Sequence, residues 1–181
     1  MLIKIKIMTT KEISKSIILK YGFLLGLVSV AMSVGLYMQG KHLEQNQTVG
    51  MISILFILIA IILGIREFSQ TNKISFGEGL KTGIGIAVVG AIVITIYNYI
   101  FTTYIDTNFV NELGEVQRQA MLASGKLTTE QIDARIEMLH KGANSFINPA
   151  IGIVFTAFLG FVFSAITTVV FIKINESKQE S

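Results

Sequence analysis

Long apolar stretches separated by polar segments run through the chain of 181 residues. Four of them stand out: residues 17–38, 49–65, 82–105 and 150–172. An α-helix rises about 1.5 Å per residue, so about 20 apolar residues cross the ~30 Å hydrocarbon core of a bilayer. A helix of a water-soluble domain carries a polar stripe instead, yet Lys20 is the one charged residue in all four stretches. The pattern predicts an all-α fold, a four-helix transmembrane bundle formed by one domain over residues 1–181.

The first stretch also has to be compared with a secretory signal peptide. The apolar part of a signal peptide covers about 7–15 residues and precedes a small-residue cleavage site. Stretch 17–38 is longer and is followed by the polar residues Gln39 to Glu44. We therefore expect it to be kept as a spanning helix. The second stretch, 49–65, is the shortest, and we expect its helix to extend by about a turn at each end.

The distribution of charged residues along the chain predicts how these helices are oriented across the membrane. Charged residues make up 15% of the chain, against about 25% in a typical soluble domain. Lys and Arg accumulate on the cytoplasmic side of membrane proteins. Ten basic residues would share the face of the two termini: Lys4, Lys6, Lys11, Lys15, Lys20, Arg66, Lys73, Lys81, Lys173 and Lys178. Five would lie on the other face: Lys41, Arg118, Lys126, Arg135 and Lys141. We expect a multi-pass protein of the inner (plasma) membrane with both termini cytoplasmic and no nucleic-acid partner.

The connection 106–148 is long and polar, and it contains helical patterns of its own. Apolar residues recur every three to four positions up to Ser124-Gly125. Thr128-Thr129-Glu130-Gln131 then fits a capping box, and a second apolar stripe follows. We expect an extramembrane helical hairpin between the third and fourth spanning helices. Its apolar face could pack on itself, on lipid or on a partner.

Small residues recur every four positions in the spanning segments, which keeps them on one helix face. Backbones can approach closely there, as helix association in lipid requires. The residues expected to pack helices are Gly22, Gly26, Gly79, Gly83, Ala87 and Gly160. Leu19-Lys20-Tyr21-Gly22 and Leu80-Lys81-Thr82-Gly83 also resemble each other. A duplicated helix pair, as in some transporters, would explain this resemblance, but coincidence is the simpler explanation.

Residues that could carry chemistry are few. There is no cysteine, and His42 and His140 are far apart in sequence, so we expect no metal site, no cofactor and no catalytic set. Asn98 is the deepest polar side chain, and we expect it to bond between helices. Four charged residues could form an ion-pair cluster on the inner face, although helix capping and headgroup contact are the simpler explanation: Arg66, Glu67, Glu78 and Lys81. In particular, Ser75-Phe76-Gly77-Glu78 fits a capping box.

Several motifs occur together in a familiar order. They are Leu19-Lys20-Tyr21-Gly22, Leu63-Gly64-Ile65-Arg66-Glu67-Phe68, the stretch 74–83, Tyr97-Asn98-Tyr99-Ile100-Phe101 and Tyr104-Ile105-Asp106. Over nearly its whole length the chain resembles the bacterial family called domain of unknown function four-one-nine-nine, common in Bacteroidetes. Asp106-Thr107 departs from the Asp-Pro of that pattern. The resemblance implies a small four-helix inner-membrane protein with a helical outer connection, and it implies no activity.

Three functions can be compared on this basis. A non-enzymatic scaffold or regulatory protein is favoured by the small-residue faces and the outer hairpin. Its partners would be the lipid bilayer and either a second copy of the chain or another membrane protein. The alternative is an oligomeric transporter or channel component. Asn98 and the possible duplication favour this alternative. The expected absence of charge within the membrane speaks against a solitary transporter. A membrane enzyme is the least favoured, because no acid, base or metal set is recognisable.

Overall fold

The computed structural model describes residues 10–44, 47–71, 74–143, 145 and 147–177. Helices make up most of this part of the chain, and no strand occurs in it. The helices are α1 (Thr10–Met38), α2 (Gln47–Thr71), α3 (Phe76–Ile100), α4 (Phe109–Ser124), α5 (Thr129–Ala143) and α6 (Ile147–Ser177). A π-helical turn, η1 (Phe101–Ile105), continues α3.

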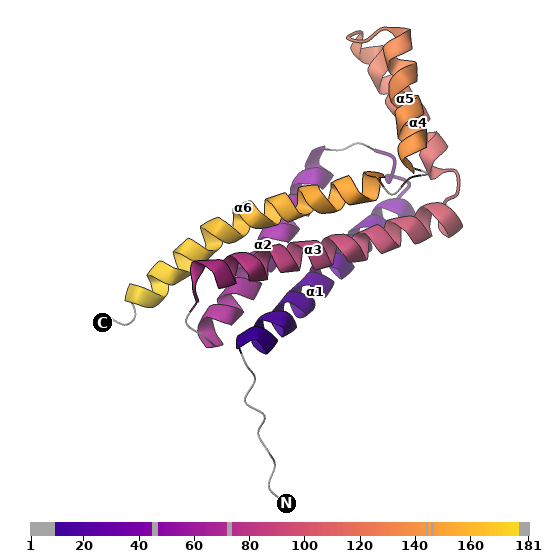
Figure 1. Ribbon diagram of the computed structural model, residues 1–181. Helices are drawn as coiled ribbons and strands as arrows, with labels where there is room; N and C mark the ends of the chain where they lie inside the picture. Colours follow the sequence, from indigo (N-terminus) through magenta and orange to yellow (C-terminus); the bar gives the residue numbers. More distant parts are fainter. Residues whose placement is uncertain (1–9, 45–46, 72–73, 144, 146, 178–181) are drawn as a thin grey trace, which may run out of the picture.

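Four of the helices, α1, α2, α3 and α6, are long and apolar enough to cross a membrane. They lie side by side, while α4 and α5 form a hairpin that projects from one end (Figure 1). The start of α1, the end of α2, the start of α3 and the end of α6 lie toward the opposite end. The predicted four-helix transmembrane bundle with a hairpin between its third and fourth spanning helices is therefore confirmed.

Each spanning helix continues beyond its apolar stretch into the polar flanks. The helix of the shortest stretch, α2, reaches 25 residues because it includes Gln47 at one end and Arg66 and Glu67 near the other. Polar flanks of this kind lie at headgroup level, where the side chains remain solvated. Four of the basic residues used to predict the orientation, Lys4, Lys6, Lys73 and Lys178, lie outside the described residues.

Helix α3 lies at the centre of the bundle, where it contacts α6 along a stripe of small residues. A Cβ atom added to Gly79 would collide with Thr168, and one added to Gly83 would lie 2.7 Å from Ser164 Cβ. Farther along, a Cβ on Gly160 would lie 2.6 Å from Ala87 Cβ. The contacts advance by four residues in opposite directions along the two helices, as antiparallel packing requires. The two backbones thus approach as closely as their small residues allow.

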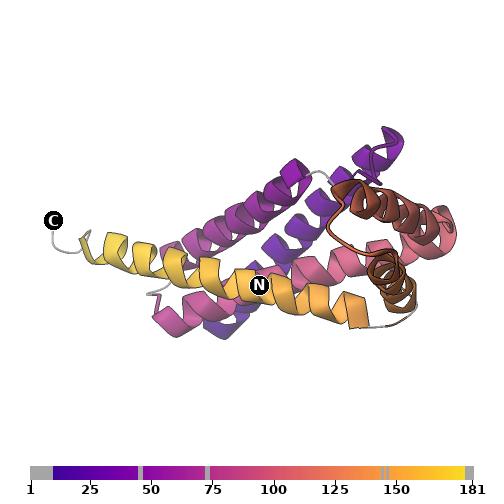
Figure 2. The same cartoon turned by 90° about the horizontal axis from the view of Figure 1, so that it is seen from above.

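Helix α1 packs on another side of α3, in parallel orientation. Val89 and Val93 of α3 pack against the backbone at Gly22 and Gly26 of α1. A Cβ atom added to Gly22 would lie 2.5 Å from Val89 Cβ. Near the end of this contact where α1 begins, the hydroxyls of Ser14 and Thr82 share a buried hydrogen bond of 3.2 Å. Figure 2, viewed from above, shows α1 and α6 on either side of α3.

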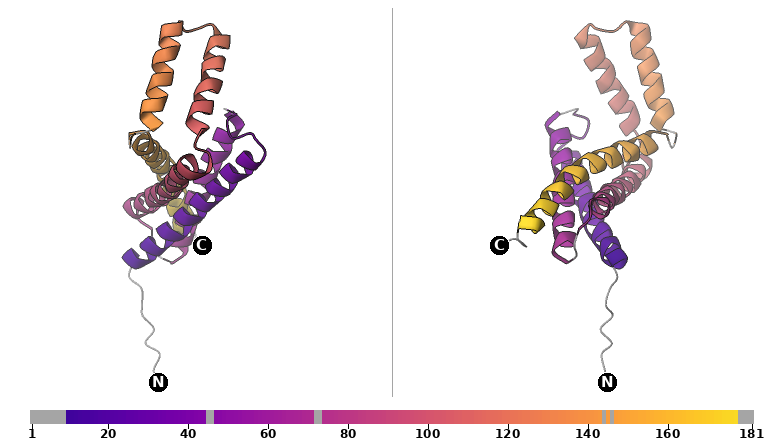
Figure 3. Two further views of the ribbon diagram at one scale, coloured as in Figure 1. Left: turned by 90° about the vertical axis from the view of Figure 1, so that its right-hand side faces the viewer. Right: turned by 60° about the vertical axis from the view of Figure 1, so that its left-hand side comes forward.

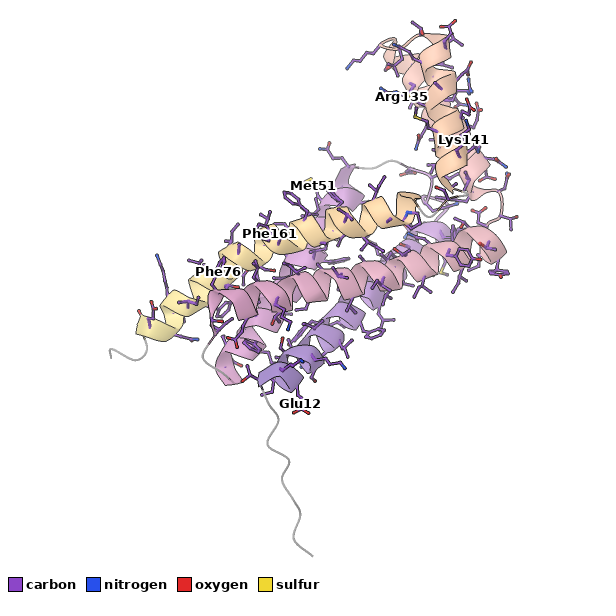
Figure 4. All side chains as sticks on the ribbon, viewed as in Figure 1. Glu12, Met51, Phe76, Arg135, Lys141 and Phe161 are labelled. Atoms are coloured by element: carbon purple, nitrogen blue, oxygen red, sulfur yellow. The ribbon has the colours of Figure 1, made fainter. Side chains whose placement is uncertain are left out.

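The packed interior lies toward the end where α1 begins. Phe68, Ile61 and Ile65 of α2 and Ile86 of α3 are fully buried there, and Ile17 of α1 is nearly so. Outward-facing side chains of the spanning helices are also apolar. Phe161 of α6 is an example, 47% exposed and labelled in Figure 4. Apolar residues on both sides of a helix are expected where the surrounding solvent is lipid.

The hairpin packs mainly on itself. Ile132 and Ile136 of α5 are buried, and His140 packs near Gly114 of α4. Gly125 ends α4 with φ 62°, the left-handed conformation that glycine adopts freely. The predicted capping box opens α5, since Thr128 Oγ1 accepts from Gln131 N at 3.3 Å and Gln131 Oε1 accepts from Thr128 N at 3.0 Å. Figure 3 shows the two helices side by side above the bundle.

A matched pair of glycine variants in α6 tests the close approach of α3 and α6. Gly160→Ala should lower the free energy of unfolding by about 1–3 kcal/mol, because the new methyl group meets Ala87. A Cβ on Gly152 meets nothing within 4 Å, so Gly152→Ala should be neutral or mildly stabilising through helix propensity. Thermal unfolding of both purified variants in detergent measures the difference in Tm. Equal Tm values would contradict the packing described above.

Candidate functional site

The described residues include one place where aromatic and ionisable side chains from several segments meet, at the junction between the bundle and the hairpin. We call this group the outer junction, because the charge distribution predicts that the hairpin end of the bundle faces outward. It consists of Tyr37 from α1, His42 from the α1–α2 connection, Phe101 and Asp106 from the end of α3, and Phe109 and Glu112 from α4.

A tight turn after α1 carries His42 back toward the bundle. Gly40 adopts φ 67°. Its N–H donates to the Tyr37 carbonyl at 2.9 Å, and Lys41 N donates to the Leu36 carbonyl at 2.9 Å. This pair of bonds is a Schellman motif, which satisfies the last carbonyls of a helix. The turn lets His42 contact the ring of Tyr37, the residue near the end of α1.

A π-helical turn places Asp106. Its N–H donates to the carbonyl of Phe101 at 2.8 Å, five residues earlier, so η1 is wider than the α-helix it continues. The chain leaves the helix at Asp106, with φ −126° and ψ 79°. This wide turn ends α3 with Phe101 buried and the Asp106 carboxylate beside His42.

The rings of the outer junction contact each other mostly edge to face. Phe101 meets Tyr37 with centroids 5.0 Å apart and Phe109 with centroids 5.6 Å apart. His42 meets Tyr37 edge-on at 4.9 Å and stacks on Phe109 at 5.9 Å. Edge-to-face and offset pairs at these distances are favourable beyond the area they bury. Since Phe109 belongs to α4, these contacts attach the hairpin to the bundle.

The ionisable groups of the junction lie on one side of the imidazole. His42 Nε2 is 3.1 Å from Asp106 Oδ2, and both side chains are largely buried, 16% and 13% exposed. His42 Nδ1 is buried and has no hydrogen-bond partner. Ligand atoms of His42, Asp106 and Glu112 all lie within 4.8 Å of one another. One nitrogen and two carboxylates at this spacing form a set of metal-ligating groups.

Sequence reasoning did not find this group. His42 and Asp106 are 64 residues apart, and in the sequence Asp106 stands out only because Thr107 follows it where the family pattern has proline. The available signal was the aromatic residues near the ends of the first and third apolar stretches, Tyr37, Tyr97, Tyr99, Phe101 and Tyr104, a residue type that is common at headgroup level. Phe101 is instead buried in the junction.

Two of the four charged residues predicted on the inner face, Glu67 and Glu78, bond to residues outside that group in the structure. Glu67 Oε2 accepts hydrogen bonds from Lys20 Nζ at 2.6 Å and from Tyr21 OH at 2.7 Å, which joins α2 to α1. Glu78 forms the predicted capping box with Ser75, accepting from Ser75 N at 3.0 Å. Arg66 and Lys81 lie on the same end of the bundle, on α2 and α3. The two carboxylates therefore serve two separate contacts.

Asn98 lies on the surface of the bundle. Its side chain is exposed, as are those of Tyr99 and Ile100 beside it. Our expectation that it bonds between helices of the chain is corrected by this placement. The glycine face of α1 packs on α3 as far as Val93, and Asn98 lies beyond it at an exposed position of the helix.

Removing the ring of Phe109 tests whether the outer junction holds the hairpin. Spin labels on cysteines introduced at Met51 of α2 and Met138 of α5 report the distance between bundle and hairpin, since the chain has no native cysteine. Phe109→Ala should broaden the distance distribution, because the stacking on His42 and the contact with Phe101 are lost. Phe155→Ala, an exposed ring of α6, is the control and should leave the distribution unchanged. A narrow distribution in Phe109→Ala would rule out this anchoring role.

Comparison with known proteins identifies the family of the chain but assigns it no function. No curated protein and no solved structure matches the chain significantly. The family model described as "Protein of unknown function (DUF4199)" matches residues 20–173, which include α2, α3, the hairpin and most of α1 and α6. The match covers most of the chain and agrees with the resemblance seen in its motifs. The chain belongs to the DUF4199 family of proteins of unknown function.

Proposed function

We propose that the protein is a non-enzymatic scaffold or regulatory protein of the bacterial inner membrane, and that the α4–α5 hairpin is the element that contacts its partner. The observation that carries the proposal is the hairpin itself. It packs mainly on itself, stands clear of the bundle over most of its length, and is attached at its base by the outer junction. An element that is ordered and projects from the membrane presents its side chains to a partner at little entropic cost.

The hairpin surface is suited to a polar, salt-sensitive contact. Arg118 pairs with Asp133 across the two helices at 2.5 Å, and Lys141 pairs with Glu137 at 2.6 Å. The hydrogen bond from the Lys141 ammonium lowers the pKa of the Glu137 carboxyl. Leu122 and Met138, 54% and 71% exposed, add isolated apolar contacts. Figure 4 shows Arg135 and Lys141 on α5, with Lys141 toward the base of the hairpin.

The polar groups within the bundle support a scaffold over a transporter. The buried polar side chains among the described residues are hydroxyls: Ser14, Thr82, Ser164, Thr167 and Thr168. Ser14 and Thr82 bond to each other, and Ser164 donates to the carbonyl of Gly160 in its own helix. A hydroxyl pair such as Ser14 and Thr82 holds two helices together, whereas transport sites in membranes are usually built from ionisable groups or unwound helices.

Site-specific photocrosslinking tests the proposal. A photoreactive residue replacing Met138 on the hairpin should give one discrete protein adduct in native membranes, and mass spectrometry would distinguish a second copy of the chain from another membrane protein. The same residue replacing Phe161, which faces outward from α6, is the control and should capture lipid. Failure to obtain a reproducible protein adduct from the hairpin would count against the scaffold role.

Cysteine labelling tests the orientation on which the proposal depends. Gln70 and Ser124 are exposed, on α2 and at the tip of the hairpin. In intact cells a membrane-impermeant maleimide should label Ser124→Cys but not Gln70→Cys. Gln70→Cys should be labelled only after the membrane is permeabilised. The reverse pattern would place the hairpin in the cytoplasm. Ser124 is preferred to Gly125, because Gly125 has φ 62° and a cysteine there would be strained.

A further inference from the structure

We propose that His42, Asp106 and Glu112 form a binding site for a divalent transition-metal cation, of the zinc or manganese class, at the outer junction. The site would join three segments: the α1–α2 connection, the end of α3 and the first turn of α4. It goes beyond the scaffold role, which assigns no ligand to these residues.

The spacing of the groups suits one ion. In tetrahedral zinc sites the bonds to nitrogen and oxygen are about 2.0–2.2 Å, so neighbouring ligand atoms lie about 3.3 Å apart. His42 Nε2 and Asp106 Oδ2 are 3.1 Å apart, close to that distance. The Glu112 carboxylate has a ligand atom within 4.8 Å of the other two. Because Glu112 is exposed, its flexible side chain can move inward by the remaining ångström or so.

The neighbouring rings hold the His42 imidazole so that one of its nitrogens, Nε2, can bind a cation. Tyr37 and Phe101 meet the His42 ring edge-on, and Phe109 stacks on it. Nδ1 is enclosed without a partner, while Nε2 points at the carboxylate of Asp106. A ring fixed in this way needs no reorientation to bind a cation through Nε2, which lowers the entropic cost of binding.

The one imidazole nitrogen and two carboxylates of this group favour a particular class of cation. Imidazole nitrogen binds Zn²⁺ and other first-row transition metals, whereas Ca²⁺ and Mg²⁺ prefer sites made entirely of oxygen ligands. Two carboxylates balance the charge of a divalent ion. Asn108 Nδ2 donates to Glu112 Oε1 at 3.0 Å, and a hydrogen bond of this kind orients a ligating carboxylate. Three protein ligands would leave room for water or for a ligand atom from a partner.

Calorimetry of the full-length protein tests the site. The protein is purified in detergent, freed of any polyhistidine tag and treated with EDTA, and then titrated with ZnCl₂, MnCl₂, CaCl₂ or MgCl₂. We expect one zinc ion per chain, with manganese binding more weakly and calcium and magnesium not competing. Glu112→Gln should weaken zinc binding at least about tenfold, since even outer-sphere partners of metal ligands contribute that much.

The choice of variants separates ligation from folding. Glu112 is exposed, so its amide should preserve the fold and the contact between His42 and Asp106. Glu115→Gln, an exposed carboxylate on the same helix, is the matched control and should bind zinc as the unmodified protein does. Asp106→Asn should weaken binding as Glu112→Gln does. Equal affinities in Glu112→Gln and Glu115→Gln would overturn the proposal, because zinc would then bind to scattered surface carboxylates.

A second measurement follows the structural effect of the ion. With spin labels at Met51 and Met138, zinc should narrow the distance distribution in the unmodified protein and leave that of Glu112→Gln unchanged. This result does not depend on the identity of a protein partner, so the metal site can fail while the scaffold role stands, or the reverse. Calorimetric binding with no change in either distribution would disprove the structural role assigned to the ion.

Discussion

The structure depends on how closely the backbones of α3 and α6 approach. Lipid surrounds apolar side chains as favourably as protein does, so helices associate in a membrane through close contact and polar bonds. Gly79, Gly83 and Ala87 of α3 meet Thr168, Ser164 and Gly160 of α6 in antiparallel register. The hydroxyls of Thr168 and Ser164 occupy the space beside Gly79 and Gly83 that a Cβ atom would otherwise fill.

This central contact also determines where the rest of the chain lies. With α3 packed against both α6 and α1, the outer end of α3 meets the turn after α1. The π-helical turn then redirects the chain into the hairpin at Asp106. The outer junction thus forms where the membrane-embedded part of the chain meets the projecting part. Ionisable groups can be kept there because they lie at the edge of the apolar region, where burial is incomplete.

Particular residues show how far sequence reasoning reached. Both capping boxes, at Ser75 and Thr128, were predictable because each requires only residues three positions apart. The left-handed turn at Gly125 likewise follows from a local preference. Asn98 was misjudged because its surroundings depend on how far the neighbouring helices extend along α3. The partner of Glu67 was missed for a similar reason, since Lys20 is 47 residues away.

The sequence by itself determined the number of spanning helices, the existence of the hairpin and the helix faces made of small residues. These properties follow from chain length, hydropathy and helical periodicity, which are local. Only the tertiary structure decided which small faces meet and that His42, Asp106 and Glu112 come together. Pairing of helices and convergence of side chains from distant segments depend on the relative position of several helices at once, and no local pattern encodes that position.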